Sequence, residues 1–112
     1  MCTKRQLEKI TDKMVSAYKE IYGDAIVKIF LYGSYARNEQ TNQSDVDMVG
    51  IIRGNRVELQ RKLRELWSVS ADVGLENDVI VSPTIVPYDE FEKYRDTLPY
   101  YMNIEKEGVR VG

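Results

Sequence analysis

The chain has 112 residues, a formal net charge of −2 and no histidine. This length predicts a single domain spanning residues 1–112, with one core and no room for a second. The slightly acidic balance argues against a non-specific nucleic-acid binder, because such proteins neutralise phosphates with clustered Lys and Arg. Without histidine, His-ligated zinc sites and Ser-His-Asp triads are excluded. Catalysis would have to use carboxylates, hydroxyls, Lys, Arg or a metal ion.

The compartment is predicted from the single cysteine and from hydropathy. Cys2 alone cannot form an internal disulfide framework, and its presence fits a reducing cytosol. The N-terminal pattern is that of a charged amphipathic helix rather than a signal peptide, and the apolar runs are shorter than a membrane span. We therefore expect a cytoplasmic protein.

The first half of the chain is predicted to fold as helix, strand, loop and strand. Residues 3–22 form the helix, because apolar side chains recur at helical spacing and Thr3 with Gln6 makes a capping box. Gly23 is a suitable residue to end it. Residues 25–32 form a largely apolar strand, residues 38–44 a polar loop, and residues 45–52 a second strand.

The second half is predicted to begin with a helix from Arg56 to about Val73, capped by Asn55. Its buried face would carry Leu59, Leu63, Leu66, Trp67 and Val73. Residues 78–86 form a third strand, which Pro83 indicates is bent or close to a sheet edge. Residues 88–94 and 98–106 are short helical segments, and the residues from Gly108 onwards either add a short strand or stay loose.

This element order predicts an α/β (α+β) fold with a small mixed sheet. The helices would pack on one face of the sheet. The other face would stay open and carry acidic side chains.

The turn after the first strand is the first candidate binding feature. The apolar run ends abruptly at Gly33 and Ser34. Gly33 has no Cβ, so the backbone there can approach a ligand closely. The Ser34 hydroxyl and the N–H groups that follow can hold a phosphate, because a helix start has unbonded donors and a positive dipole. Arg37 either contacts a triphosphate, since guanidinium pairs well with phosphate oxygens, or is a solvated helix residue.

The second strand carries two acids in an otherwise apolar run. Asp45 and Asp47 stand at alternate positions, which places both carboxylates on one face of the strand. Two adjacent carboxylates repel unless a cation lies between them, so the pair predicts a divalent-metal site. Two-metal transfer usually gathers three carboxylates. Asp78 is the candidate for the third, since it opens the predicted third strand, with Glu76 and Asp72 as rivals.

These residues resemble a known signature. Gly33-Ser34 followed by Asp45-x-Asp47 is similar to the motif of minimal nucleotidyltransferases, in the DNA polymerase β-like superfamily. The segment 31–37 resembles the Phe-Gly-Ser-x-Ala-Arg-Gly motif of that family, with Asn38 at the last glycine position. The tail around residues 94–101 also resembles small members, so the resemblance covers nearly the whole chain.

The resemblance implies a nucleotidyltransferase fold and a metal-dependent enzyme. Such an enzyme transfers a nucleoside monophosphate, with AMP from ATP favoured, to an acceptor hydroxyl that a partner protein can carry. It implies two Mg²⁺ ions, replaceable by Mn²⁺, on the catalytic acids Asp45, Asp47 and Asp78, with the nucleotide on Gly33, Ser34 and Arg37. The alternative it implies is an antitoxin-like module that neutralises a helical HEPN-type partner by contact. The missing acceptor-binding domain favours a second polypeptide or a second copy of the chain.

Overall fold

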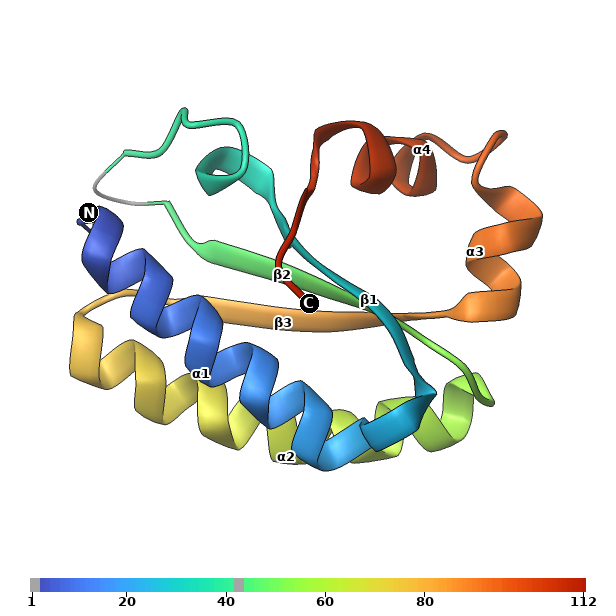
Figure 1. Cartoon of the computed structure of the whole chain (residues 1–112), viewed down its shortest axis with the longest axis horizontal. Helices are drawn as coiled ribbons and strands as arrows, with labels where there is room; N and C mark the ends of the chain where they lie inside the picture. Colours follow the sequence, from blue (N-terminus) through green and yellow to red (C-terminus); the bar gives the residue numbers. More distant parts are fainter. Residues whose placement is uncertain (1–2, 42–43) are drawn as a thin grey trace.

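The computed structural model describes residues 3–41 and 44–112 (Figure 1). Its centre is a four-stranded sheet in the order β3-β2-β1-β4. Cys2 and part of the predicted 38–44 loop, Asn42 and Gln43, lie outside the described residues.

The N-terminal helix α1 (Lys4–Tyr22) begins at the predicted capping box. The Gln6 N–H donates to Thr3 Oγ1 over 3.1 Å, and the Thr3 N–H donates to Gln6 Oε1 over 3.0 Å. The helix ends at Gly23, as the sequence predicts, and a short 3₁₀ turn, η1 (Gly23–Ala25), leads into β1 (Ile26–Tyr32). The capping box and the glycine therefore fix both ends of α1.

The sheet is mixed, as predicted. Strand β2 (Val46–Ile52) runs antiparallel to β1 and parallel to β3 (Val81–Pro87), and the short β4 (Val109–Arg110) pairs with the other side of β1. Strand β3 lies at the sheet edge. The prediction that Pro83 marks an edge is confirmed, because a proline lacks the N–H that a central strand would need.

The second long helix corrects three sequence predictions. Helix α2 (Arg56–Asn77) starts at the predicted cap, where Asn55 Oδ1 accepts the Val57 N–H over 2.9 Å. However, it ends at Asn77 rather than near Val73, so β3 begins at Val81 rather than at Asp78. Trp67, predicted to be buried, is 46% exposed. Its neighbour Leu66 lies on the buried stripe, and successive helical residues are separated by about 100° around the axis.

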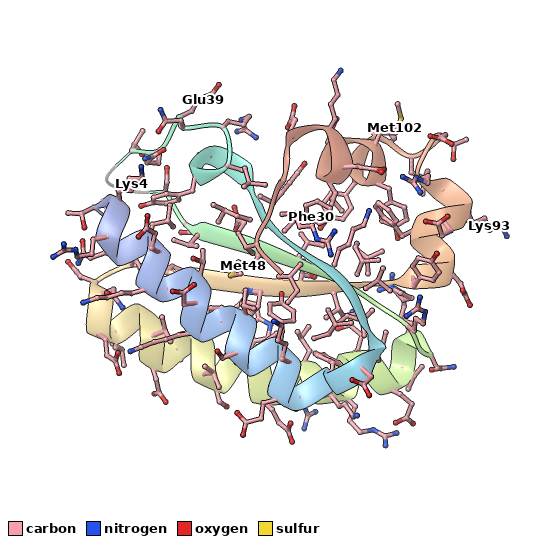
Figure 2. The ribbon with its side chains drawn as sticks, viewed as in Figure 1. Lys4, Phe30, Glu39, Met48, Lys93 and Met102 are labelled. Atoms are coloured by element: carbon pink, nitrogen blue, oxygen red, sulfur yellow. The ribbon has the colours of Figure 1, made fainter. Side chains whose placement is uncertain are left out.

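The two faces of the sheet are covered unequally. Helices α1 and α2 lie together on one face, where they enclose the larger apolar cluster. On the opposite face α3 (Tyr88–Tyr94) and α4 (Pro99–Glu107) pack over a smaller cluster: Phe30, Val49, Ile51, Val86, Phe91 and Ile104. Figure 2 shows Met48 on the side of α1 and Phe30 beneath α4. The predicted open face is therefore open only in part.

Alternation along β2 leaves one position out of the core. Val46, Met48 and Ile52 contribute to the cluster under α1 and α2, while Val49 and Ile51 contribute to the smaller cluster. Every residue of β2 is buried except Asp47, which is half-buried. The fold thus presents this one acid at the uncovered end of the second face. No helix within the described part of the chain has the length and apolarity needed to cross a membrane.

Candidate active site

The turn that follows β1 is built around Gly33. Residues Gly33–Tyr35 form one 3₁₀ turn, η2, closed by N–H groups of Ala36 and Arg37 that donate to the Gly33 carbonyl over 3.1 and 3.2 Å. Gly33 has a φ of 76°, in the left-handed region that favours glycine. A Cβ placed on Gly33 would lie 2.6 Å from Asp47 Oδ2. Two features therefore favour glycine at this position, the backbone angle and the contact with the acid. The close approach of a ligand to Gly33 stays a prediction.

The backbone conformation of Asn38 explains why asparagine can occupy the last glycine position of the motif that the sequence resembles. It follows the turn with a φ of 58°, so this position also has a left-handed backbone. Asparagine is among the few non-glycine residues that adopt this conformation readily. Asn38 therefore adopts a backbone angle that otherwise favours glycine.

The two predicted acids lie at the end of the sheet beside this turn. Asp47 pairs in register with Tyr32 of β1 and Ser82 of β3, and Asp45 immediately precedes β2. Burial raises the pKa of the Asp47 carboxyl, and the negative charge of Asp45 raises it further. The structure thus brings Asp47 and Gly33 into close contact, with Asp45 two residues earlier in the chain.

Ser34 and Arg37 occupy different settings. Ser34 lies within η2, directly after the glycine that contacts Asp47. Arg37 is exposed and makes two ion pairs: its Nε lies 3.2 Å from Glu39 Oε2 and its Nη1 lies 3.5 Å from Glu107 Oε2. Of the two predicted phosphate ligands, Ser34 is the residue next to the glycine that faces Asp47, while Arg37 is held by carboxylates of its own loop and of α4.

Asp78 does not lie where the sequence prediction placed it. It follows the last residue of α2 in a left-handed conformation, with φ 52° and ψ 49°, and its N–H donates to the Gly74 carbonyl. Its rival Glu76 pairs with Lys13 at 2.8 Å, and Asp72 is exposed on α2. Across residues 3–41 and 44–112, no three acidic, Cys or His side chains are grouped so as to hold a metal ion.

Two clefts flank the acids. One, of about 470 Å³, is lined by Asp47 together with Tyr32, Ser82, Thr84 and Tyr100 among others. The other, of about 780 Å³, is lined by Asp45 and Asp78 and by the apolar side chains of Trp67, Leu75 and Ile80. Trp67 lines both clefts. Asp45 and Asp78 therefore share a cleft, although they do not form a metal-binding cluster with Asp47.

The sequence did not indicate Ser82 or Tyr100 as part of the site, although both line the cleft with Asp47. Tyr100 meets Tyr32 edge-on, with ring centroids 6.0 Å apart, beside Asp47. Burial raises the pKa of the Tyr100 hydroxyl, with a smaller contribution from Tyr32. By contrast, Tyr35 is buried in the core, and the Tyr101 hydroxyl donates to Glu90 Oε2 over 3.3 Å. Ser82 is placed beside Asp47 by the register of β2 and β3, which a single sequence does not reveal.

Comparison with known sequences gives a consistent family. A model described as the nucleotidyltransferase domain matches residues 7–111. Two Methanocaldococcus jannaschii proteins, provisionally named protein adenylyltransferases MJ0126 and MJ1379, are 32% and 33% identical to this chain. Their matches cover 70% and 76% of this chain and 84% of each relative. The match to a third such protein, MJ1305, is 32% identical and covers 55% of this chain but only 44% of that relative.

Solved structures agree in fold. A toxin–antitoxin crystallised with AMP-PNP superposes with a TM-score of 0.58 at 15% identity, covering 89% of this chain and 70% of that one. A variant of the toxin–antitoxin MntA-HpeT gives 0.56 at 13% identity, with the same coverage. At these identities the likeness establishes the fold alone. Since the family model spans almost the whole chain, the chain belongs to the nucleotidyltransferase domain family, whose activity is the transfer of nucleotidyl groups.

Proposed function

We propose that the chain transfers the AMP moiety of ATP to a hydroxyl group on a partner protein. The observation that carries this proposal is the contact between the turn and the acid: the Cβ position of Gly33 lies 2.6 Å from Asp47 Oδ2. A triphosphate held by the turn would therefore lie against the carboxylates. The adenine and the protein acceptor are supported by the names of the M. jannaschii relatives.

The acid pair fits a divalent cation. Carboxylate oxygens are the ligands that Mg²⁺ prefers, and the raised pKa of Asp47 reflects burial and a repulsion that a bound cation would relieve. In this proposal Asp45 and Asp47 hold Mg²⁺, for which Mn²⁺ can substitute. When bound, the metal offsets phosphate charge and lowers the pKa of an acceptor hydroxyl.

The nucleotide is held mainly by η2. The Ser34 hydroxyl and the first N–H groups of the turn would bind the terminal phosphates, because the start of a helical turn offers unbonded donors. Arg37 would exchange Glu39 and Glu107 for phosphate oxygens. That exchange costs little, since exposed ion pairs contribute only about 0–1 kcal/mol.

The transfer is an in-line displacement at the α-phosphorus. The acceptor oxygen forms the new P–O bond, the bond to pyrophosphate breaks, and the acceptor proton passes to a base. In this mechanism Gly33 and Ser34 would orient the triphosphate. The proximity of Asp47 to Gly33 and its place in the cleft with Ser82 and Tyr100 support a position for it beside the α-phosphate. The uncovered end of the sheet gives the acceptor access to this position.

A second candidate is a binding module that neutralises a helical partner by contact, as an antitoxin does. The observation that favours it is the apolar cleft beside Asp45. Its lining residues Trp67, Leu75 and Ile80 are 46%, 84% and 62% exposed. Exposed apolar groups that gather in one place mark interaction sites more often than isolated ones do. The two candidates are compatible, because a partner that docks here could carry the acceptor.

Thermal melting with ATP and Mg²⁺ tests the site. A ligand that binds only the native state raises its stability, so the parent chain should melt at a higher temperature with ligand than without. Asp45→Asn combined with Asp47→Asn should abolish this shift, while Asp72→Asn, an exposed acid of α2, should retain it. Ser34→Ala should weaken ATP binding about fivefold, the equivalent of ~1 kcal/mol for one hydrogen bond. An undiminished shift in the double variant would refute the metal assignment.

Experiments with a partner protein distinguish transfer of AMP from neutralisation by contact alone. Where a gene next to that of this chain encodes a helical protein, that protein is the partner to co-express with the chain. Adenylyl incorporation into the partner is measured by mass spectrometry, and complex formation is measured by size exclusion. An enzyme should mark the partner only with Asp45 and Asp47 intact. If no mass increment appears and the acid variants still bind and neutralise the partner, the chain acts by contact.

A further inference from the structure

The pairing of β2 with β3 determines which side chain of β3 stands beside Asp47. Asp47 lies in register with Ser82, and Val49 lies in register with Thr84. Residues in register on neighbouring strands point to the same face, and the strands are about 4.8 Å apart. Asp47, Ser82 and Thr84 line one cleft, which Met48 and Pro83 of the same two strands and Trp67 of α2 also line. Ser82 therefore stands beside Asp47 on β3, as Tyr32 does on β1.

A second metal ion beside Asp47 would need a further carboxylate, and Ser82 is the neighbouring position on β3 that could supply one. Ser82 offers a neutral hydroxyl, which is a much weaker ligand for Mg²⁺ than a carboxylate. The described residues contain no cluster of three potential ligands, and the four that are not described (Met1, Cys2, Asn42 and Gln43) have no carboxylate side chain. Asp78 lies before β3 at the end of α2, in the cleft on the Asp45 side.

We propose that this chain by itself holds one divalent ion with its nucleotide, and that Ser82 stands where the carboxylate for a second ion would be. The inference rests on the proposed function, because the first ion is the one assigned to Asp45 and Asp47. Its consequence is that the acceptor side of the site is incomplete in the isolated chain. The cleft over Ser82 has Tyr100 and Trp67 in its walls, which are 43% and 46% exposed, so a carboxylate from the acceptor protein can reach it.

The test counts Mn²⁺ ions by the electron paramagnetic resonance signal of free Mn²⁺. The chain is saturated with an ATP analogue that has a methylene group between the α- and β-phosphorus, so turnover cannot occur. We expect one bound Mn²⁺ per parent chain and two per Ser82→Asp chain. Thr84→Asp is the matched control, since it adds a carboxylate to the same face of the same strand opposite Val49, and should bind one. Asp78→Asn should also bind one.

Each departure from these counts has a separate meaning. Two ions in the parent and one in Asp78→Asn would overturn the inference and identify Asp78 as the third ligand. One ion in folded Ser82→Asp would overturn it as well. Circular dichroism establishes folding, and Ser82→Glu provides a second carboxylate variant if Ser82→Asp does not fold. A parent that binds no ion with the nucleotide would instead refute the proposed function, since Asp45 and Asp47 would then hold none.

Discussion

The two faces of β2 differ in what surrounds their side chains. Toward α1 and α2, Val46, Met48 and Ile52 are all 0% exposed in one continuous core. On the other face Val49 and Ile51 are buried in the smaller cluster, while Asp47 is covered only in part. A single strand therefore supplies the centre of the core on one side and the half-buried carboxylate of Asp47 on the other. Substitutions of Met48 on one face and of Asp47 on the other should therefore have opposite effects on stability.

The largest expected effect is on the closed face. Met48→Ala should lower the free energy of unfolding by about 2–5 kcal/mol, because it leaves a cavity among residues that cannot close it fully. Chemical denaturation measures this loss. Asp47→Asn, one residue earlier in the chain, should retain or raise stability while removing nucleotide binding. Equal losses of unfolding free energy in Met48→Ala and Asp47→Asn would contradict this difference between the two faces.

The next effect concerns the contact that joins the two motifs. Gly33→Ala should destabilise the fold by about 1–3 kcal/mol, since its φ of 76° is strained for alanine and the new methyl group would meet Asp47 Oδ2. A double-mutant cycle with Asp47→Ala separates these causes. Removing the carboxylate should recover the part due to the clash and leave the backbone strain. If the two substitutions are additive, the contact has no energetic role.

The sequence predicts features that are encoded locally, and predicts them well. Thr3 and Gln6 mark the start of α1 because a capping box needs only neighbouring residues, and Pro83 marks an edge strand because its missing N–H is a local property. The turn at Gly33 and the place of Asp47 in β2 follow from local residues in the same way, whereas Asp45 lies just before β2 and lines a different cleft from Asp47. These features need no knowledge of the tertiary structure.

The remainder depends on contacts between distant segments. Helix α2 continues past Val73 to Asn77. After the helix, the Val79 N–H donates to the Gly74 carbonyl. Asp78 therefore lies at the end of the helix and not in the strand predicted for it. Ser82 became part of the site only once the register of β2 and β3 was known. Likewise, the apolar periodicity of α2 did not show that Trp67 lies off the buried stripe. Register and helix length are set by tertiary packing, which a single sequence does not display.

The smallest effect is the pH dependence that Asp47 adds to stability. Burial, and then the charge of Asp45, raise the pKa of Asp47 above the ordinary carboxyl value that it has in the unfolded chain. Between these two pKa values the native state binds more protons than the unfolded state, so the free energy of unfolding falls as the pH rises through this window. At neutral pH the ionised Asp47 therefore destabilises the fold.

Asp47→Asn removes this penalty. The stability difference between the variant and the parent should be near zero below the unfolded pKa and should grow to a constant value in favour of the variant above the folded pKa. Urea denaturation over a series of pH values, without divalent metal, measures this difference. Asp45→Asn should give a smaller gain, because it removes the repulsion but not the burial of Asp47. A difference that instead grew toward acid pH would contradict the raised pKa.

Mg²⁺ with ATP should reduce the pH dependence of the parent but not that of Asp47→Asn, because only the parent retains both carboxylates to bind the cation.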